Sequence, residues 1–267
     1  MAPSVPCIVL IAVQAVLAKV LMASRFLPNA NLECINSELL SCGDLALDSA
    51  NSCCVESPGG ELVHPQIWDS QPPRGPLDSW TIHGLWPNFC GGHGFPSNCD
   101  RSRDYTNVAE ILKENGASNL LSFMDKFWVN LNGRNEEFWE HEWAKHGTCM
   151  STLQPSCRDG NHPRGFEAVI YFQTAVKLFE SFPTYQWLAS AGITPSSHRA
   201  YRREEILSAL SSASGVTPSL ECKGKVFSGV SWYFNLKGPI AGADFVPLSA
   251  SSLGSCPAVG IEYLPKN

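Results

Sequence analysis

The chain has 267 residues, which is long enough for one sizeable hydrophobic core and fits one domain or at most two. Its composition, with 44% hydrophobic and 16% charged residues, is that of an ordinary globular protein and excludes an intrinsically disordered chain. A formal net charge of −6 and an isoelectric point near 5.6 argue against a general electrostatic grip on nucleic acid. A polyanionic substrate would therefore need local positive charge at its binding site.

The first 18 residues, MAPSVPCIVLIAVQAVLA, predict a secretory signal peptide whose end lies between residue 18 and residue 24. The apolar run from Val5 to Ala18 is too short to span a bilayer. A buried N-terminal helix is the alternative interpretation. We expect the mature protein to be a single domain over residues 32–267 that is secreted and not bound to a membrane, with delivery to the vacuolar or lysosomal lumen as the alternative.

Ten of the eleven cysteines lie outside this segment. An even number of cysteines in a secreted chain predicts five disulfides. A zinc site is the alternative, and it is disfavoured because no two cysteines have the C-x-x-C spacing usual in such sites. The spacing of the cysteines does not by itself give their connectivity.

Residues 34–79 are rich in Cys, Pro, Gly and Ser and predict loops with one short strand near LVHPQIWD. In the following SWTIHGLW, Trp80 and Ile82 alternate with Thr81 and His83, which predicts a strand with two distinct faces. Pro87 is expected to end that strand. Residues 88–104 predict a loop rich in Gly and Cys.

Five segments with helical spacing of their apolar residues follow: TNVAEILKENG (106–116), NLLSFMDKFW (119–128), NEEFWEHEWAKHG (135–147), FEAVIYFQTAVKLFESF (166–182) and REEILSALSSASG (203–215). The first of them has Thr106 as its expected N-cap. The chain after Cys222, with KVFSGVSWYFNL at residues 225–236, predicts strands. Strands at both ends of a helical middle predict an α+β fold, a largely antiparallel β-sheet packed with several α-helices in a single disulfide-rich domain.

The segment FWEHEWAKHGTC, residues 138–149, combines many ionisable groups with three large aromatic residues. On a helix, four of its polar side chains lie about one turn apart and form a compact patch: His141, Glu142, Lys145 and His146. We expect the aromatic side chains of Phe138, Trp139 and Trp143 to flank this patch and anchor the helix. The carboxylate of Glu142 is expected to raise the pKa of a neighbouring histidine by favouring its charged form.

The letters H-E-W-A resemble the start of the zinc-binding motif H-E-x-x-H, but Lys145 stands where the second histidine is required. A lysine also repels a cation, so the patch suits an anion, and no metal is expected. Lysine and imidazole groups fit a phosphate that gains charge in a transition state. Histidine also exchanges protons readily near mildly acidic pH. A solvated helix face is the alternative.

The segment WTIHGLWPNFC, residues 80–90, supplies a second candidate histidine. His83 lies near the end of the predicted strand and is followed by Gly84, which permits the close approach of another chain segment or a ligand. Taken separately, a lone histidine in a strand is more often structural, and Trp86 is more often part of a core.

Taken together, SWTIHGLWP and FWEHEWAKHGTC resemble the two active-site segments of the ribonuclease T2 family, the acid, transferase-type endoribonucleases. QIWD and the ten-cysteine layout resemble the fungal-type members. The resemblance runs from Cys34 to Cys256, which is nearly all of the expected mature chain.

The resemblance implies that His83 and His146 form an acid–base pair. The counterpart of His146 takes the proton from the ribose 2′-hydroxyl, whose oxygen attacks the adjacent phosphorus in line. The counterpart of His83 protonates the departing 5′ oxygen, and the 2′,3′-cyclic phosphate is then hydrolysed to a 3′-phosphate. Glu142 and Lys145 would stabilise the pentacoordinate phosphorane, and His141 would hold the phosphate.

No cofactor or metal is needed in this scheme, because the substrate carries its own nucleophile. The implied substrate is single-stranded RNA, and DNA should be inert because it lacks the 2′-hydroxyl. We expect a monomer that works at acidic pH, since one histidine must be protonated while the other is free.

Base binding is also implied by the resemblance, with Trp86 lining the main base pocket and Phe95 or Phe89 assisting. Asn88 stands where fungal-type members often carry an acidic residue. An amide both donates and accepts hydrogen bonds, whereas a carboxylate only accepts them. The base preference of those members therefore does not carry over, and we expect low base specificity.

The resemblance implies five disulfide pairs: Cys34–Cys54, Cys42–Cys90, Cys53–Cys157, Cys99–Cys149 and Cys222–Cys256. Four further histidines have no motif around them and are expected to be structural or on the surface: His64, His93, His162 and His198.

Two other functions remain as alternatives. One is a non-catalytic extracellular binding or storage protein on the same fold, which would be expected to lack a catalytic histidine, whereas this chain has both. The other is a secreted zinc hydrolase, which the position of Lys145 disfavours.

Overall fold

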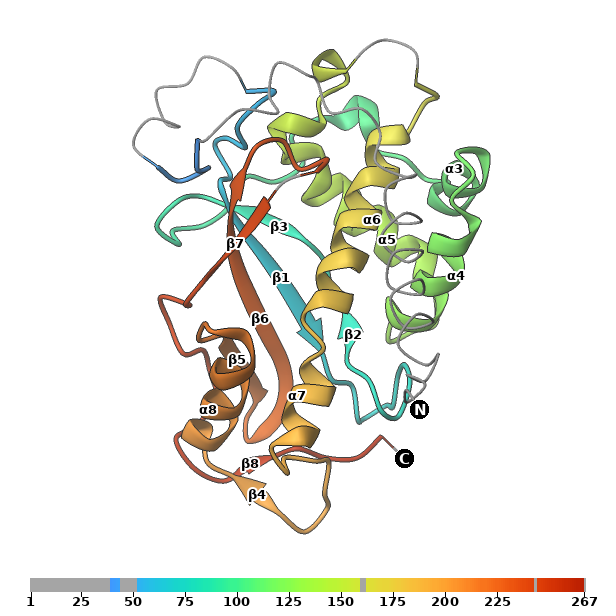
Figure 1. The fold of residues 1–267 in the computed structure, drawn as a ribbon. Coiled ribbons are helices and arrows are strands. Elements are labelled where there is room, and N and C mark those ends of the chain that lie inside the picture. The colour runs from blue at the N-terminus through green and yellow to red at the C-terminus, as the bar shows by residue number, and fades with distance from the viewer. Residues whose placement is uncertain (1–38, 44–51, 159–161, 243, 267) are drawn as a thin grey trace, which may run out of the picture.

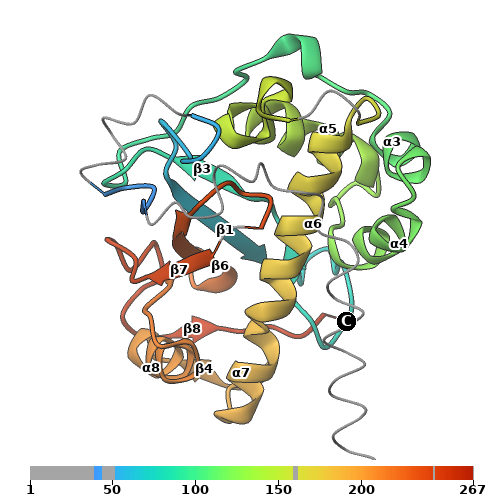
Figure 2. The same cartoon turned by 45° about the horizontal axis from the view of Figure 1, so that its top comes forward.

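The structure is a computed structural model that describes residues 39–43, 52–158, 162–242 and 244–266. The expected signal peptide and Cys34 lie outside these residues. The described chain forms a mixed eight-stranded sheet in which nearly all pairs are antiparallel, with helices packed beside it (Figures 1 and 2). The predicted α+β fold with a largely antiparallel sheet is confirmed.

Two long strands, β1 (Glu61–Ile67) and β6 (Val226–Lys237), form the centre of the sheet. On the far side of β1 lie β2 (Thr81–Ile82) and β3 (Trp86–Asn88). The other side of β6 pairs with β5 (Ser219–Lys223) and β7 (Asp244–Leu248). A short parallel contact joins β6 to β8 (Ile261–Glu262), which pairs with β4 (Ala200–Tyr201).

The helices of the described residues are α3 (Val108–Glu114), α4 (Ser118–Phe127), α5 (Asn135–Lys145), α6 (Phe166–Ser181), α7 (Thr184–Ser190) and α8 (Arg203–Ser214). Four short 3-10 turns also occur: η2 (Arg101–Arg103), η3 (Gly147–Cys149), η4 (Ser151–Leu153) and η5 (Pro155–Cys157). All five predicted helices are present. The sequence pattern missed α7, whose seven residues follow Pro183 and are too few to show a helical period.

Several boundaries differ from the predictions, and the single strand predicted in SWTIHGLW is two short strands, β2 and β3, with His83 in the loop between them. The N-cap of α3 is Asn107 rather than Thr106. Helix α5 ends at Lys145, two residues early, because the chain tightens into η3 there. Pro87 was expected to end a strand but lies inside β3, opposite Leu62. A proline is tolerated there because β3 pairs only with β1, so the missing N–H faces no second strand.

The two faces of the sheet carry different side chains, because successive residues of a strand point to opposite faces. Helix α6 crosses one face (Figure 1). The aromatic rings of His64 and Trp232, which lie on that face, contact Phe179 and Phe182 at the end of α6, with ring centroids 6.5 and 5.1 Å apart. The opposite face carries the alternate residues, including Val63 and Tyr233, which are paired across β1 and β6.

Four disulfides join the pairs Cys42–Cys90, Cys53–Cys157, Cys99–Cys149 and Cys222–Cys256. They are four of the five pairs that the family resemblance implies. Cys54 is also disulfide-bonded, and its expected partner lies outside the described residues. Within the described ranges, no helix has both the length and the apolar character needed to cross a bilayer.

A buried acid, Glu56, links the N-terminal loops to η4. Its side chain is fully buried and accepts hydrogen bonds from the backbone and hydroxyl groups of Ser151 and Thr152. Burial raises the pKa of Glu56 to about 7, although these hydrogen bonds favour the ionised form. The folded protein therefore binds a proton here more tightly than the unfolded chain does.

This linkage predicts that the free energy of unfolding falls as pH rises from 4.5 to about 7, the interval between the unfolded and folded pKa values of Glu56. We expect Glu56→Gln to flatten that dependence, because the neutral amide cannot ionise. Urea unfolding at several pH values measures the effect. Glu114→Gln, an exposed acid on α3, is the matched control and should keep the wild-type slope. An unchanged slope in Glu56→Gln would refute the linkage.

Candidate active site

The two predicted active-site segments meet around one buried carboxyl group. Glu142 of α5 is 1% exposed, and its side chain lies between His83, which directly follows β2, and His146, which directly follows α5. The distance from His83 Nε2 to Glu142 Oε1 is 3.6 Å, and that from His146 Nε2 to Glu142 Oε2 is 4.0 Å. The fold thus brings the two histidines to opposite oxygens of a single carboxyl group.

Trp86 closes this cluster from β3. Its indole Nε1 donates a hydrogen bond to Glu142 Oε2 at 2.7 Å. Its ring stacks on His146 with centroids 5.1 Å apart, and it meets His83 edge-on at 4.9 Å. The tryptophan therefore contacts all three polar members of the cluster, and one of its faces is covered by His146.

Gly84 makes room for this arrangement. A Cβ atom at this position would lie 2.6 Å from Trp86 Nε1 and closer still to Glu142 Oε2. Such contacts are far inside van der Waals distance, so only glycine lets the carboxyl group reach the loop. The close approach predicted at Gly84 is confirmed, and the approaching group is Glu142.

Buried side chains from other elements hold the backbone of this loop. Trp128 Nε1 donates to the carbonyl of His83 at 2.9 Å. His64 Nδ1 lies 3.0 Å from the carbonyl of Gly84, and because a carbonyl only accepts, that nitrogen carries the proton. The two carbonyls are thereby fixed from the core side of the sheet. His64 is fully buried, as expected for a structural histidine.

Tyr171 of α6 ties the same loop to helix α5. Its hydroxyl accepts from the backbone N–H of Leu85 and donates to the backbone carbonyl of Glu142, each at 3.3 Å. The sequence gave no signal for this link, because its partners are 86 and 29 residues away from Tyr171 along the chain. One hydroxyl group therefore sets the spacing between the two active-site segments.

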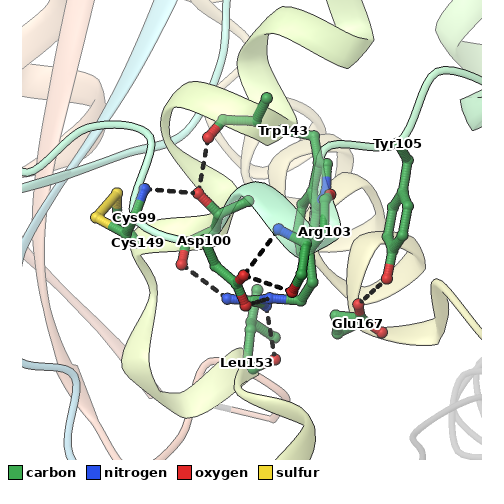
Figure 3. Close-up of polar contacts among 11 residues, drawn as sticks. Cys99, Asp100, Arg103, Tyr105, Trp143, Cys149, Leu153 and Glu167 are labelled. Carbon is green, nitrogen blue, oxygen red and sulfur yellow. Dashed lines mark hydrogen bonds and ion pairs between the residues drawn. A yellow bond between two sulfur atoms is a disulfide. The ribbon is translucent and has the colours of Figure 1, made fainter.

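The chain after His146 is fixed by the network in Figure 3. Arg103 is 3% exposed, forms an ion pair with Asp100 at 2.8 Å and donates to the carbonyls of Thr148 and Leu153. Trp143 Nε1 donates to the carbonyl of Arg103, and the disulfide of Cys149 lies beside this network. The chain is thus restrained on both sides of His146, at Trp143 of α5 and at Thr148.

Lys145 and His141 add positive charge at the rim. His141 is exposed and Lys145 is half-buried, with its Nζ 5.5 Å from the ring centre of Phe95. The charge of Lys145 lowers the pKa of His83, His141 and His146. All five predicted catalytic residues therefore belong to one electrostatically coupled site.

Burial governs the protonation of this site. It lowers the pKa of His83 to about 4 and that of His146 to about 3, with smaller contributions from the neighbouring positive charges. It raises the pKa of Glu142 to about 8, against the hydrogen bond from Trp86 and the charge of Lys145. The expectation that Glu142 raises a histidine pKa is therefore wrong, because burial also keeps the carboxyl group protonated, and hence uncharged, at the pH where the histidines titrate.

Comparisons with known proteins identify the family of the chain. The sequence profile of the ribonuclease T2 family matches residues 49–239. The chain belongs to the ribonuclease T2 family. Ribonuclease Le2 of Lentinula edodes is 47% identical over 236 residues, covering 88% of this chain and 97% of the relative. Ribonuclease T2 of Aspergillus oryzae (strain ATCC 42149 / RIB 40) is 45% identical over 218 residues, covering 81% of this chain and 78% of the relative.

Solved structures show the same fold. The crystal structure of Actibind, a T2 ribonuclease, superposes with a TM-score of 0.81 at 41% identity and covers 86% of this chain and 96% of its own. A structure of RNase NT in complex with 5′-AMP has a TM-score of 0.58 at 26% identity and covers 77% of this chain and 98% of its own. This T2 ribonuclease is accordingly an endoribonuclease that acts on RNA.

Of the residues expected to bind bases in this ribonuclease, Trp86 and Asn88 line the cavity next to His83. The Oδ1 atom of Asn88 is buried and has no hydrogen-bond partner. Phe95 is 42% exposed, with its ring 5.3 Å from His146. Phe89 is also exposed and packs near Gly94 of the same loop.

One aromatic residue has a different place from the one predicted. Trp139 and Trp143 are buried and anchor α5, as expected, but Phe138 is only half-buried and lines the cavity. Its ring centre lies 5.5 Å from that of His83. The reason is helical spacing, because Phe138 precedes His141 and Glu142 by three and four residues and therefore shares their face.

The cavity is about 620 Å³ in volume, which is within the usual range for ligand sites. Among the residues that the structure describes, no group of three or more His, Cys, Asp or Glu side chains is placed to hold a metal ion.

The position of Gly84 gives a direct test of the cluster. We expect Gly84→Ala to lower kcat/KM for RNA about a hundredfold or more, because the added methyl group must displace Glu142 or Trp86 from the two histidines. Steady-state cleavage of RNA measures the loss, and circular dichroism checks that the variant folds. Near wild-type activity in a folded Gly84→Ala variant would contradict the packing described.

Proposed function

We propose that this endoribonuclease cleaves single-stranded RNA by transphosphorylation with His146 and His83 as base and acid, without a metal ion. The observation that carries the proposal is the meeting of the two histidines across Glu142, beside a cavity that His83 lines. An acid and a base on either side of one reacting phosphate are what the transfer requires. Lys145 stands where a zinc motif has its second histidine, and its positive charge repels cations. The polar patch of α5 therefore favours an anion.

In the first step, His146 Nε2 takes the proton of the ribose 2′-hydroxyl, and that oxygen forms a bond to the adjacent phosphorus. The bond from phosphorus to the 5′ oxygen breaks, and His83 supplies its proton to that oxygen. The products are a 2′,3′-cyclic phosphate end and a free 5′-hydroxyl. In the second step the roles reverse, and water opens the ring to a 3′-phosphate. DNA is inert in this scheme because it has no 2′-hydroxyl.

Lys145 and Glu142 are proposed to stabilise the phosphorane, and His141 to hold the phosphate. Because burial raises the pKa of Glu142 to about 8, its carboxyl group is protonated in acidic solution. A protonated carboxyl group donates a hydrogen bond to a phosphoryl oxygen, whereas an ionised one would repel it. The buried position of Glu142 thus suits its proposed role.

Nucleotide binding is proposed at Trp86, Asn88 and Phe95, with low base specificity. The structure of the relative RNase NT with 5′-AMP supports nucleotide binding on this fold. The sequence of the first 18 residues and the disulfides support secretion, with delivery to a vacuolar or lysosomal lumen as the alternative. A monomer is the proposed oligomeric state.

The two-histidine mechanism predicts that His83→Phe and His146→Phe each lower kcat/KM for RNA by about 10²–10⁴-fold in the presence of a chelator. His198→Phe, at an exposed histidine far along the chain from both segments, is the control and should keep wild-type activity. Wild-type cleavage by either of the first two variants would overturn the assignment. A wild-type protein that binds RNA without cutting it would favour the binding-protein alternative.

The pKa shifts predict an acidic pH profile. His83 must be protonated to act as the acid, and its pKa is lowered, so kcat/KM should fall as pH rises through the mildly acidic range. Lys145 lowers that pKa further, so we expect Lys145→Gln to move the falling limb to higher pH while reducing the maximum rate. Lys126→Gln, at an exposed lysine of α4, serves as the control. If the falling limb of the kcat/KM profile stays at the same pH in Lys145→Gln, the effect of Lys145 on the pKa of His83 is contradicted.

A further inference from the structure

The cavity extends well beyond the catalytic residues, over the face of the sheet that α6 leaves uncovered. Its floor consists of short or branched side chains from β1 and β6: Val63, Pro65, Ile67, Gly229 and Ser231. Glu221 and Lys223 of β5 line the far wall, opposite His83 and Phe138. The space is therefore a groove across the sheet that continues from the proposed cleavage site.

Tyr233 is the one aromatic ring among the described lining residues that comes from the β5–β6 side of this groove. Val63 pairs with Trp86 on one side and with Tyr233 on the other, so the two aromatic residues stand in one row on the same face. Two strand spacings separate their backbones by about 10 Å. The row thus carries two aromatic platforms with only a valine between them.

The Tyr233 ring is half-buried and held in place. Its hydroxyl lies close to the side chain of Ser219 on the neighbouring strand β5, so the side chain lies along the sheet surface. Burial, together with the charges of Glu221 and Glu61, raises its pKa. The negative surroundings disfavour a phosphate on this ring and leave a base as the part of a nucleotide that fits.

Two further features of the groove agree with a nucleotide strand as its occupant. Asn88, two residues after Trp86 on the same strand face, presents a buried Oδ1 without a partner and can accept from the amino group of a base. Lys223 is the one lysine or arginine among the described lining residues. It pairs with Val226 of β6, seven residues along that strand from Tyr233, and lies at the opposite end of the groove.

We propose that Tyr233 is the platform for a further base, that of the nucleotide on the 5′ side of the one whose ribose is attacked. The inference rests on the proposed function. His146, the proposed acceptor of the 2′-hydroxyl proton, stacks on Trp86, so the attacking ribose lies on the Trp86 side of the cluster. Tyr233 is next in the same row, so it meets the nucleotide that precedes this ribose.

The test compares substrates with one cleavable bond. The core substrate is a dinucleotide with a ribonucleotide followed by a deoxynucleotide. One extended substrate adds a deoxyadenosine nucleotide on the 5′ side and another adds it on the 3′ side, and neither addition introduces a 2′-hydroxyl. Stacking of one base on an aromatic side chain predicts that the 5′ addition raises kcat/KM about tenfold in the wild-type enzyme.

Tyr233→Leu should abolish this gain, so that the ratio of kcat/KM between the 5′-extended and core substrates falls to about one. Tyr233→Phe keeps the ring and should keep the ratio. The effect of the 3′ addition should be the same in all three proteins. The proposal is overturned if the 5′ addition gives no gain in the wild type. It is also overturned if Tyr233→Leu lowers the rates on all substrates by the same factor, which indicates a structural role.

Calorimetric binding of the fully deoxy core and 5′-extended strands separates this proposal from the proposed function. Wild-type protein that fails to cleave the core substrate contradicts the proposed function alone. Tighter binding of the extended deoxy strand, lost in Tyr233→Leu and kept in Tyr233→Phe, still supports the platform. Equal affinities of the core and extended strands for the wild type refute it.

Discussion

The burial of Glu142 is the constraint on which the active site depends. A carboxyl group that is 1% exposed needs a partner from another element, and here the indole of Trp86 donates the hydrogen bond, while His83 and His146 lie 3.6 and 4.0 Å away. The missing side chain of Gly84 gives the carboxyl group its place. The same burial raises the pKa of Glu142 and lowers those of the histidines, which links the packing to the expected acidic activity.

The core of the protein holds the partners of this carboxyl group in place. Three consecutive residues of the loop after β2, His83, Gly84 and Leu85, have backbone groups bonded to Trp128, His64 and Tyr171. Such bonds are short-range and directional, so the loop cannot shift without leaving buried polar groups unpaired. Acid–base catalysis requires this kind of rigidity, because a shift of a few tenths of an ångström between proton donor and acceptor changes the rate of proton transfer.

Much of this arrangement was predictable from local patterns. The helical spacing of apolar residues predicted five helices, and Val, Phe, Trp and Tyr in residues 225–236 predicted β6. The two motifs predicted one site with His83, Glu142 and His146, and the structure places these three side chains together. The links that hold them, such as the Tyr171 hydroxyl between Leu85 and Glu142, join residues far apart in sequence and leave no periodic trace. The position of Phe138 in the cavity could have been predicted from its three-residue spacing to His141. The prediction of a core position relied on its aromatic character alone.

The face of the sheet that α6 leaves uncovered lies next to the proposed cleavage site. Strand alternation places bulky residues under α6 and mostly short ones between Trp86 and Tyr233 on the opposite face, so the same pattern that builds the core also forms the floor of a groove. Val63 and Ser231 belong to that floor, while their neighbours Leu62 and Trp232 are in the core.

The central claim, that the ribose 2′-hydroxyl is the nucleophile between the two histidines, is tested most directly by following the products with phosphorus NMR. The substrate is a deoxy strand that contains a single ribonucleotide, incubated with the mature protein in chelator at acidic pH. The account predicts one cut, 3′ to the ribonucleotide, with a 2′,3′-cyclic phosphate signal that appears first and then converts to a 3′-phosphate. Cleavage at deoxy positions, a 5′-phosphate product, or cleavage that requires added metal would contradict it.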